Sequence, residues 1–355
     1  MFSSLPFNFM FLVVMIFGTI FSLSSSHWLG VWAGLEINLI GFLPILVCQN
    51  SMLESESAVK YFIIQALGSG FLIFGSLFNY SLSFSWEFLA QDFMTFPLGM
   101  LFLMFGLFFK MGLFPFHFWL PSVMAGLSWL SCLLLTTWQK VAPVFLVLCI
   151  MDTNLIHTIF FVVCIFSVGS SLVSGVGGMN QTQVRALLAY SSVGHVGWIV
   201  YVSCYSESSV KIYFSIYVII SICIFLSLWL TNFGNLKNLG SISKADAKSK
   251  FSFMLMLLSL GGLPPLLGFI SKWAVISMSM SASPWGFLFG LILGSLLSLF
   301  YYLSLFFSEV VTFKFNLMGS FGFLFSELSM LTSLIVLVNL LGGMMLILLL
   351  PLISN

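Results

Sequence analysis

The sequence predicts an all-α polytopic membrane protein with about eleven transmembrane helices and no soluble domain. The chain of 355 residues is 60% hydrophobic and 6% charged, whereas soluble domains carry about 25% charged residues. Its mean hydropathy is +1.16. Apolar runs long enough to cross the hydrocarbon core recur along the whole chain. The net charge of +1 is too small to indicate nucleic acid or an acidic partner.

Short polar segments such as "QNSMLESES" and "MNQTQVR" separate the apolar runs. We expect spans near residues 5–24, 28–48, 57–80, 95–118, 127–151, 155–177, 186–205, 212–232, 251–278, 285–308 and 328–351. The N-terminal stretch has no Lys or Arg and no small-residue cleavage site, which favours a first span over a targeting peptide. We therefore expect residues 1–355 to form a single membrane domain.

The loops predict the orientation of the chain. With eleven spans, the even-numbered loops and adjoining helix ends lie on the side of the N-terminus. They hold Lys60, Arg185, Lys237, Lys244, Lys248, Lys250 and Lys314, whereas the opposite side holds only Lys211. Positive charge in short loops stays on the side of synthesis. The N-terminus is therefore expected in the matrix or cytoplasm, and the C-terminus on the outer side.

Four ionisable residues fall inside expected spans. Glu36 lies in the second span ("WAGLEINLIGFLP"), Lys110 in the fourth ("FGLFFKMGLFPFHFW"), Lys140 in the fifth and Lys272 in the ninth. Each costs roughly 2.5–3.5 kcal/mol at the bilayer centre, so the four together cost on the order of 10 kcal/mol. Residues this costly normally face the protein interior, pair with one another or line water.

Three interpretations of these charges remain open. Three lysines and one glutamate cannot all be neutralised by pairing, and a surplus lysine held between burial and a carboxylate can load and release a proton. This favours a proton path. Buried ion pairs that fix helix registry are the first alternative, although apolar replacements often serve stability as well. A site for an anionic solute is the second.

Two of the lysine-bearing spans are interrupted by glycine and proline. The fourth contains Gly112 and Pro115, and the ninth contains Pro264 and Pro265 in "LGGLPPLLGFISKW", just before Lys272. Adjacent prolines remove backbone donors, and an unwound helix is tolerated in a membrane only where it is buried or faces water. We expect discontinuous helices 4 and 9, which are typical of transport sites; a simple proline kink is the alternative.

The broken spans are five apart, which predicts an internal repeat. Because five is odd, the second copy must insert upside down, as in the inverted repeats of secondary transporters. We expect repeat one over about 1–151, repeat two over about 155–308, and an extra helix over about 328–351. The match is loose, since Lys110 precedes its prolines whereas Lys272 follows its pair.

Two histidines are further candidates. His195 lies mid-span in "LLAYSSVGHVGWIV", with Ser191 and Ser192 at positions i−4 and i−3, so the three share one helical face. A proton relay and a neutral histidine bonded to a serine or a carbonyl are equally compatible with this pattern. His117, at the end of the fourth span, either orients the break or connects water to Lys110.

The sequence favours neither a metal site nor a redox site. The six cysteines (Cys48, Cys132, Cys149, Cys164, Cys204 and Cys223) form no C-x-x-C pair and are typical of packing residues. There is no G-x-G-x-x-G unit after a strand. We expect no metal, NADH, flavin or quinone to be bound by this chain.

Six motifs together resemble one family. "GLEINLIGFLP", "ESAVKYFIIQA", "KMGLFPFHFWLP", "TWQKVAPVF", "NQTQVRALLAYSSVGHVGW" and "GLPPLLGFISKW" occur in the order found in the chain 2 family of mitochondrial NADH–ubiquinone oxidoreductase. Its members are antiporter-like, proton-pumping subunits in the membrane arm of respiratory complex I. The resemblance covers about residues 28 to 277 and implies that Glu36, Lys110, Lys140 and Lys272 form the buried polar axis. Relatives often have glutamate at Ser122 and lysine at Ala186, neither of which belongs to that axis.

The resemblance also implies the setting. It places the chain in the mitochondrial inner membrane beside other membrane-arm subunits, both antiporter-like and small hydrophobic ones, and lipids. NADH, FMN, iron–sulfur clusters and ubiquinone would be held elsewhere in the complex. As a hypothesis, Lys110 stores a proton under the control of Glu36 and passes it to Lys140 or Lys272. A stand-alone proton/cation antiporter and a purely structural subunit are the alternatives.

Overall fold

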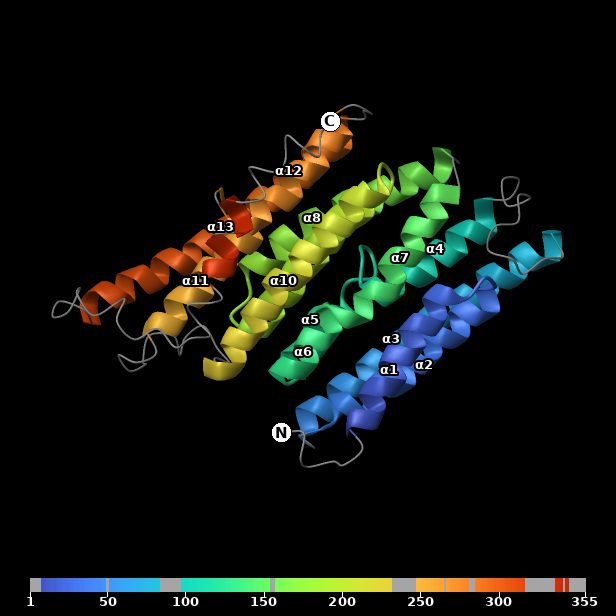
Figure 1. The fold of residues 1–355 in the computed structure, drawn as a ribbon, viewed down its shortest axis with the longest axis horizontal. Coiled ribbons are helices and arrows are strands. Elements are labelled where there is room, and N and C mark those ends of the chain that lie inside the picture. Colours follow the sequence, from blue (N-terminus) through green and yellow to red (C-terminus); the bar gives the residue numbers. More distant parts are fainter. Residues whose placement is uncertain are drawn as a thin grey trace. The chain divides into compact units, whose positions relative to one another are not determined.

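A computed structural model describes residues 8–48, 51–83, 97–153, 157–231, 247–264, 266–280, 285–316, 336–340 and 342–344. The main elements of these residues are thirteen α-helices (Figure 1). They are α1 (Asn8–Ser24), α2 (Trp28–Leu46), α3 (Met52–Ser83), α4 (Pro97–Met111), α5 (Trp119–Gly126), α6 (Trp129–Thr136), α7 (Trp138–Thr153), α8 (His157–Met179), α9 (Val184–Val202), α10 (Glu207–Thr231), α11 (Ala247–Gly261), α12 (Leu267–Ser279) and α13 (Trp285–Asn316). Residues 336–340 and 342–344 are also helical.

Six helical stretches in the described part of the chain are long and apolar enough to cross a membrane. They are Trp28–Leu46, Met52–Tyr80, Trp129–Asp152, His157–Met179, Glu207–Trp229 and Trp285–Phe307. Four shorter apolar helices accompany them: Phe9–Ser24, Leu98–Met111, Ser252–Gly261 and Leu267–Ser279. The described helices confirm the expectation of an all-α polytopic membrane protein.

The helices fall into two compact units. The first comprises Met1–Ser170 with Ile199–Cys204, and the second comprises Ser171–Trp198 with Tyr205–Asn355. In the first unit α1, α2 and α3 run side by side (Figure 1). Small residues allow close approach of α1 and α2: a Cβ on Gly34 would lie 2.5 Å from the backbone nitrogen of Ser22.

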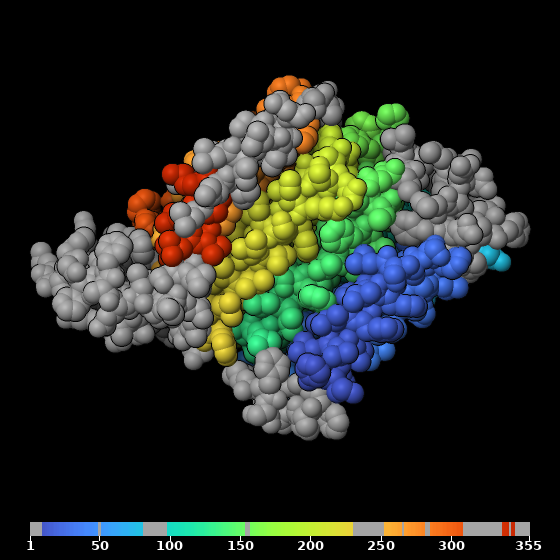
Figure 2. Space-filling view, in the orientation of Figure 1, coloured from blue at the N-terminus to red at the C-terminus, as the bar shows by residue number. Residues whose placement is uncertain are grey.

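The other face of α1 is apolar and exposed. Phe9 and Phe17 are 71% and 59% exposed, and α1 lies on the visible surface of its unit (Figure 2, dark blue). In a membrane such a face meets lipid tails or a neighbouring apolar helix at no desolvation cost. In the second unit α10 packs against α11 and α12, and α11 packs against α13.

Three helix boundaries differ from the sequence expectation. Helix α3 begins at Met52, within a segment expected to be a loop, because the Ser51 hydroxyl accepts a hydrogen bond from the Glu54 N–H (3.2 Å) and caps the helix. Helix α5 occupies residues expected to lie between spans. The expected span 127–151 is one helical stretch, Trp129–Asp152, in which a local distortion of the helix at Thr137 (φ −107°, ψ −70°) separates α6 from α7.

Candidate functional site

Both expected helix breaks are present, and each starts with the same backbone motif. Helix α4 ends at Met111, where Gly112 (φ +73°) donates to the Phe109 carbonyl (3.3 Å) and Leu113 donates to the Phe108 carbonyl (3.1 Å). This is a Schellman motif, which requires the left-handed conformation that glycine adopts at no steric cost.

The second break repeats this geometry. Helix α11 ends at Gly261, Gly262 (φ +81°) donates to the Ser259 carbonyl (3.0 Å) and Leu263 donates to the Leu258 carbonyl (3.4 Å). The sequences of the two breaks align as Gly-Leu-x-Pro, at 112–115 and 262–265. Pro265, one of the expected site residues, lies outside the described residues, whereas Pro115 and Pro264 lie in the breaks.

In the first unit the structure brings Glu36 and Lys110 together. The Lys110 Nζ lies 4.0 Å from the Glu36 Oε1, and the two side chains are 5% and 25% exposed. Lys110 is in the last turn of α4, directly before the Schellman motif. The separation is that of a charge pair rather than a short hydrogen bond.

A buried amide pair links α2 to α7 next to these charges. The Asn38 Nδ2 donates to the Gln139 Oε1 (2.9 Å), and the Gln139 Nε2 donates to the Asn38 Oδ1 (3.1 Å). The Tyr61 hydroxyl also donates to the Gln139 Oε1 (3.4 Å). Asn38 is two residues from Glu36, and Gln139 directly precedes Lys140, which is 2% exposed. The pair therefore fixes the backbones that carry both ionisable groups.

His117 lies in the first break, between α4 and α5. It is 4% exposed and packs between the rings of Phe114 and Phe118, at centroid distances of 6.2 and 4.1 Å. Ser122, where relatives often have glutamate, is exposed and donates to the Trp119 carbonyl (2.9 Å).

In the second unit Lys272 is buried against the break that precedes its own helix. Its Nζ donates to the Gly261 carbonyl (2.7 Å), the last residue of α11. A cation at a helix C-terminus is favoured by the helix dipole. The lysine side chain also fits against Gly262, where a Cβ would lie 3.0 Å from the Lys272 Cδ and 3.1 Å from its Nζ.

His195 on α9 lies within a buried aromatic environment. Its Nδ1 is 3.0 Å from the Tyr213 hydroxyl, and its ring lies 5.3 Å from that of Tyr217. Of the two serines expected on its helical face, Ser191 lines the same cavity as His195. Ser192 is buried but is not part of that lining, and its hydroxyl donates to the Ala189 carbonyl (2.7 Å).

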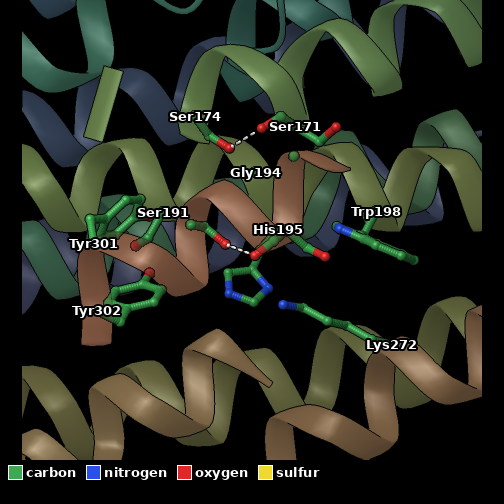
Figure 3. A pocket seen from close by; sticks show the side chains of 12 residues that line it. Ser171, Ser174, Ser191, Gly194, His195, Trp198, Lys272, Tyr301 and Tyr302 are labelled. Carbon is green, nitrogen blue, oxygen red and sulfur yellow. Dashed lines mark hydrogen bonds between the residues drawn. The ribbon is translucent and has the colours of Figure 1, made fainter. Parts of the chain in front are cut away.

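A small polar cavity brings His195 and Lys272 together. Its volume is about 20 Å³, enough for a water molecule. In Figure 3 the Lys272 amino group points toward the His195 ring, and Tyr301 and Tyr302 approach the cavity from α13. The Tyr302 hydroxyl lies beside Ser191 and Tyr301, but it forms no well-aligned hydrogen bond with another described residue.

The sequence reasoning missed several polar residues of these sites. They are Asn38, Tyr61, Gln139, Tyr213, Tyr301 and Tyr302. Each of them is a polar residue inside an apolar run of the sequence. Among the described residues no group of three or more His, Cys, Asp or Glu side chains lies close enough together to hold a metal ion.

The family model and the relatives of this chain point to the same family. The family model "NADH:quinone oxidoreductase/Mrp antiporter, TM" matches residues 25–300. The chain is 37% identical over 297 residues to NADH-ubiquinone oxidoreductase chain 2 of Lumbricus terrestris, an alignment that covers 83% of this chain and 84% of the relative. It is 39% identical over 288 residues to the Xenopus laevis protein of the same name, with 80% of each chain covered.

The fold is also found in solved structures. A chain of respiratory complex I from Thermus thermophilus with bound aureothin is similar with a TM-score of 0.77 at 23% sequence identity. The similarity covers 96% of this chain and 77% of that chain. At this identity the likeness concerns the fold alone.

Proposed function

The chain belongs to the NADH:quinone oxidoreductase/Mrp antiporter family, as an antiporter-like, proton-translocating subunit of the complex I membrane arm, and we propose that its protons move through Glu36, Lys110, Lys140, His195 and Lys272. It is thus a subunit of NADH:ubiquinone oxidoreductase. The observation that carries the proposed residues is the buried Lys110–Glu36 pair, with 4.0 Å between Nζ and Oε1.

We propose that Lys110 stores the proton. A charge buried in a low-dielectric surrounding responds strongly to the next charge, since two unit charges 4 Å apart interact by up to about 4 kcal/mol at an effective dielectric of 20. The Glu36 carboxylate stabilises the protonated form of Lys110. Any movement that lengthens this pair releases the proton, and such a movement can be imposed by a neighbouring subunit.

The groups that would receive the proton from Lys110 are Lys140, His195 and Lys272. Lys140 lies in the first turn of α7, where the Asn38–Gln139 pair holds its helix against α2. In the second unit His195 and Lys272 share a cavity with room for water, which suits proton exchange between an imidazole and an amine. We propose that Lys110 and Lys140, and then His195 and Lys272, act in successive parts of one transfer path. The hydroxyl of Ser191 would support this path.

We further propose that the helices form eleven spans arranged as an inverted repeat. In this grouping α4 with α5, α6 with α7, and α11 with α12 each make one span, and residues 328–351 make the last. The shared Gly-Leu-x-Pro breaks of spans four and nine support repeats over about 1–151 and 155–308. Most of the expected last span lies outside the described residues.

The setting follows from the relatives. We propose the mitochondrial inner membrane, with the N-terminus in the matrix and the C-terminus toward the intermembrane space, because the lysine bias of the loops points that way. The partners are the other membrane-arm subunits, and the exposed apolar face of α1 suits either such a subunit or lipid. NADH, FMN, iron–sulfur clusters and ubiquinone are assigned to other parts of the complex.

The test is Lys110→Met in the assembled complex, with proton pumping and NADH oxidation measured in sealed vesicles. We expect assembly to persist and pumping to be lost. Lys60→Met is the matched control, because Lys60 is 46% exposed and pairs with the exposed Glu56. Full pumping by the Lys110 variant would disprove the proposed path and favour a structural subunit.

The sequence alone also allows a stand-alone proton/cation antiporter, but the 37% identity to a complex I chain 2 over 83% of this chain disfavours it. The two functions would use the same fold and the same buried charges, so assembly is the property that tests them. Native-gel separation of mildly solubilised membranes, with peptide identification of the chain, decides between them. Migration in a large NADH-oxidising assembly supports the complex I subunit, whereas migration as a single chain or small oligomer supports the antiporter.

A further inference from the structure

The described helical residues near the C-terminus hold a buried asparagine against the second break. Asn339 is 2% exposed, whereas Leu337 and Leu340 on the same short helix are 52% and 38% exposed. In a membrane protein leucine side chains can face lipid at no desolvation cost, whereas a buried amide is costly unless it is hydrogen-bonded. The burial of Asn339 therefore indicates that its amide has specific hydrogen-bond partners.

Asn339 has partners on both sides of the break. Its Oδ1 accepts a hydrogen bond from the Leu267 N–H (3.3 Å), at the first residue of α12. Its Nδ2 donates to the Met256 Sδ (3.4 Å), on α11. The backbone also approaches closely, because a Cβ on Gly342 would lie 3.1 Å from the Leu267 side chain. One side chain therefore ties the two half-helices together.

The start of α12 needs such a partner. The first N–H groups of a helix have no acceptor within the helix, and a membrane offers none outside it. The N-cap residue is Leu266, which makes no capping hydrogen bond through its side chain. Asn339 supplies an acceptor oxygen for one of these groups, the N–H of Leu267 at the first helical position.

The other end of the same break is satisfied by Lys272, whose Nζ donates to the Gly261 carbonyl (2.7 Å). The break thus carries a cation on the C-terminal end of α11 and an amide oxygen on the N-terminal end of α12, each matched to the local helix dipole. Lys272 lies five residues beyond Leu267, about one and a half turns along α12.

We propose that Asn339 is a positioning residue, which caps α12 from the C-terminal helix and thereby sets the place of Lys272 at the break. This role rests on the proposed function of Lys272 in proton transfer. Through the contacts of Asn339 with Leu267 and Met256, the described helical residues near the C-terminus hold α11 and α12 together at the break. We call this contact the clamp.

The test uses Asn339→Leu, which keeps the side-chain size but removes both hydrogen bonds, in the assembled complex. Hydrogen exchange of peptides that contain residues 262–270 is measured together with protons pumped per NADH oxidised. We expect exchange in this segment to rise on the order of fivefold, the factor for loss of a typical N-cap, and pumping to fall. Leu340→Ala, on the exposed side of the same helix, is the control and is expected to change neither quantity.

Asn339→Asp is the rescue variant, because burial favours the neutral carboxylic acid, which matches asparagine in size and keeps an oxygen that accepts from Leu267. We expect it to restore both readouts, and to restore assembly if Asn339→Leu prevents it. Unchanged exchange and pumping in Asn339→Leu, or no rescue by Asn339→Asp, would overturn the clamp.

The exchange measurement separates the clamp from the wider proposal. Faster exchange at the break in Asn339→Leu, with full pumping in Lys272→Met, would retain the clamp but remove the proton role of Lys272. Loss of pumping in Lys272→Met, with no effect of Asn339→Leu, would retain the proton role of Lys272 but remove the clamp.

Discussion

Replacing Gly262 by alanine tests whether the geometry of the second break controls Lys272. Gly262 has φ +81°, a conformation that costs a residue with a Cβ about 1–2 kcal/mol. The added methyl would lie 3.0 Å from the Lys272 Cδ and 3.1 Å from its Nζ, so the lysine has to move. Its hydrogen bond to the Gly261 carbonyl, now 2.7 Å, is expected to lengthen or break.

The adjacent Gly261 gives a matched control. It is the last residue of α11, and the atom nearest to an added Cβ is the Tyr302 Cδ2 at 3.4 Å, an ordinary contact. Gly261→Ala should gain up to about 1 kcal/mol of helix propensity. The two substitutions, one residue apart, therefore differ by roughly 2 kcal/mol, which corresponds to a factor of about 30 in the opening of the break.

The assay is hydrogen exchange at residues 258–272 in the assembled complex, with proton pumping per NADH oxidised measured on the same preparations. Gly262→Ala should exchange at least about tenfold faster than Gly261→Ala, and should pump less. Indistinguishable exchange and pumping in the two variants would refute the idea that the left-handed glycine holds Lys272 in place.

Three further predictions concern other contacts. Single substitutions to leucine at Asn38 or Gln139 should each destabilise the complex, and the double variant should recover part of the loss, with a coupling of roughly 0.6–1.7 kcal/mol in a double-mutant cycle. Gly268→Ala should prevent assembly on native gels because a Cβ there would overlap the Ser259 carbonyl, whereas Gly70→Ala, with no atom within 4 Å, should assemble normally. Tyr213→Phe removes the hydroxyl 3.0 Å from the His195 Nδ1 and should lower pumping several-fold while NADH oxidation continues.

The burial of the charged residues could be predicted from the sequence, because exposing an ionisable side chain to the lipid interior costs several kcal/mol. Lys110, Lys140 and Lys272 are indeed all buried, at 7%, 2% and 9% exposure. The glycine and proline residues predicted both helix breaks for a similar reason, since their backbone constraints are local. These inferences needed only the chain's own chemistry and the bilayer's thickness.

The partners of these residues could not be predicted in this way. The Asn38–Gln139 pair joins positions 101 residues apart, and Asn339 reaches Leu267 across 72 residues. Asparagine and glutamine carry no charge to mark them as costly, so nothing local separates a clamp from a tolerated polar residue. Pairings of this kind are properties of the packed fold. The first turn of α3 is a different case, because its cap from Ser51 to the Glu54 N–H is local and the polar composition of this segment favoured a loop.

The two breaks share one backbone motif but have different surroundings, and this predicts different consequences for the same substitution. A Cβ on Gly112 (φ +73°) would lie 2.9 Å from the Leu120 Cδ1 and 3.4 Å from the Trp119 ring, and no lysine atom is among its three nearest neighbours. Gly112→Ala should therefore carry the same backbone cost of about 1–2 kcal/mol as Gly262→Ala.

That cost should appear in folding rather than in proton transfer. Lys110 precedes the first break and pairs sideways with Glu36, whereas Lys272 binds the carbonyl at the edge of the second break. We expect Gly112→Ala to lower the amount of assembled complex on native gels, while each complex that does assemble pumps normally. A lowered proton yield per assembled complex would show instead that Lys110, like Lys272, depends on the geometry of its break.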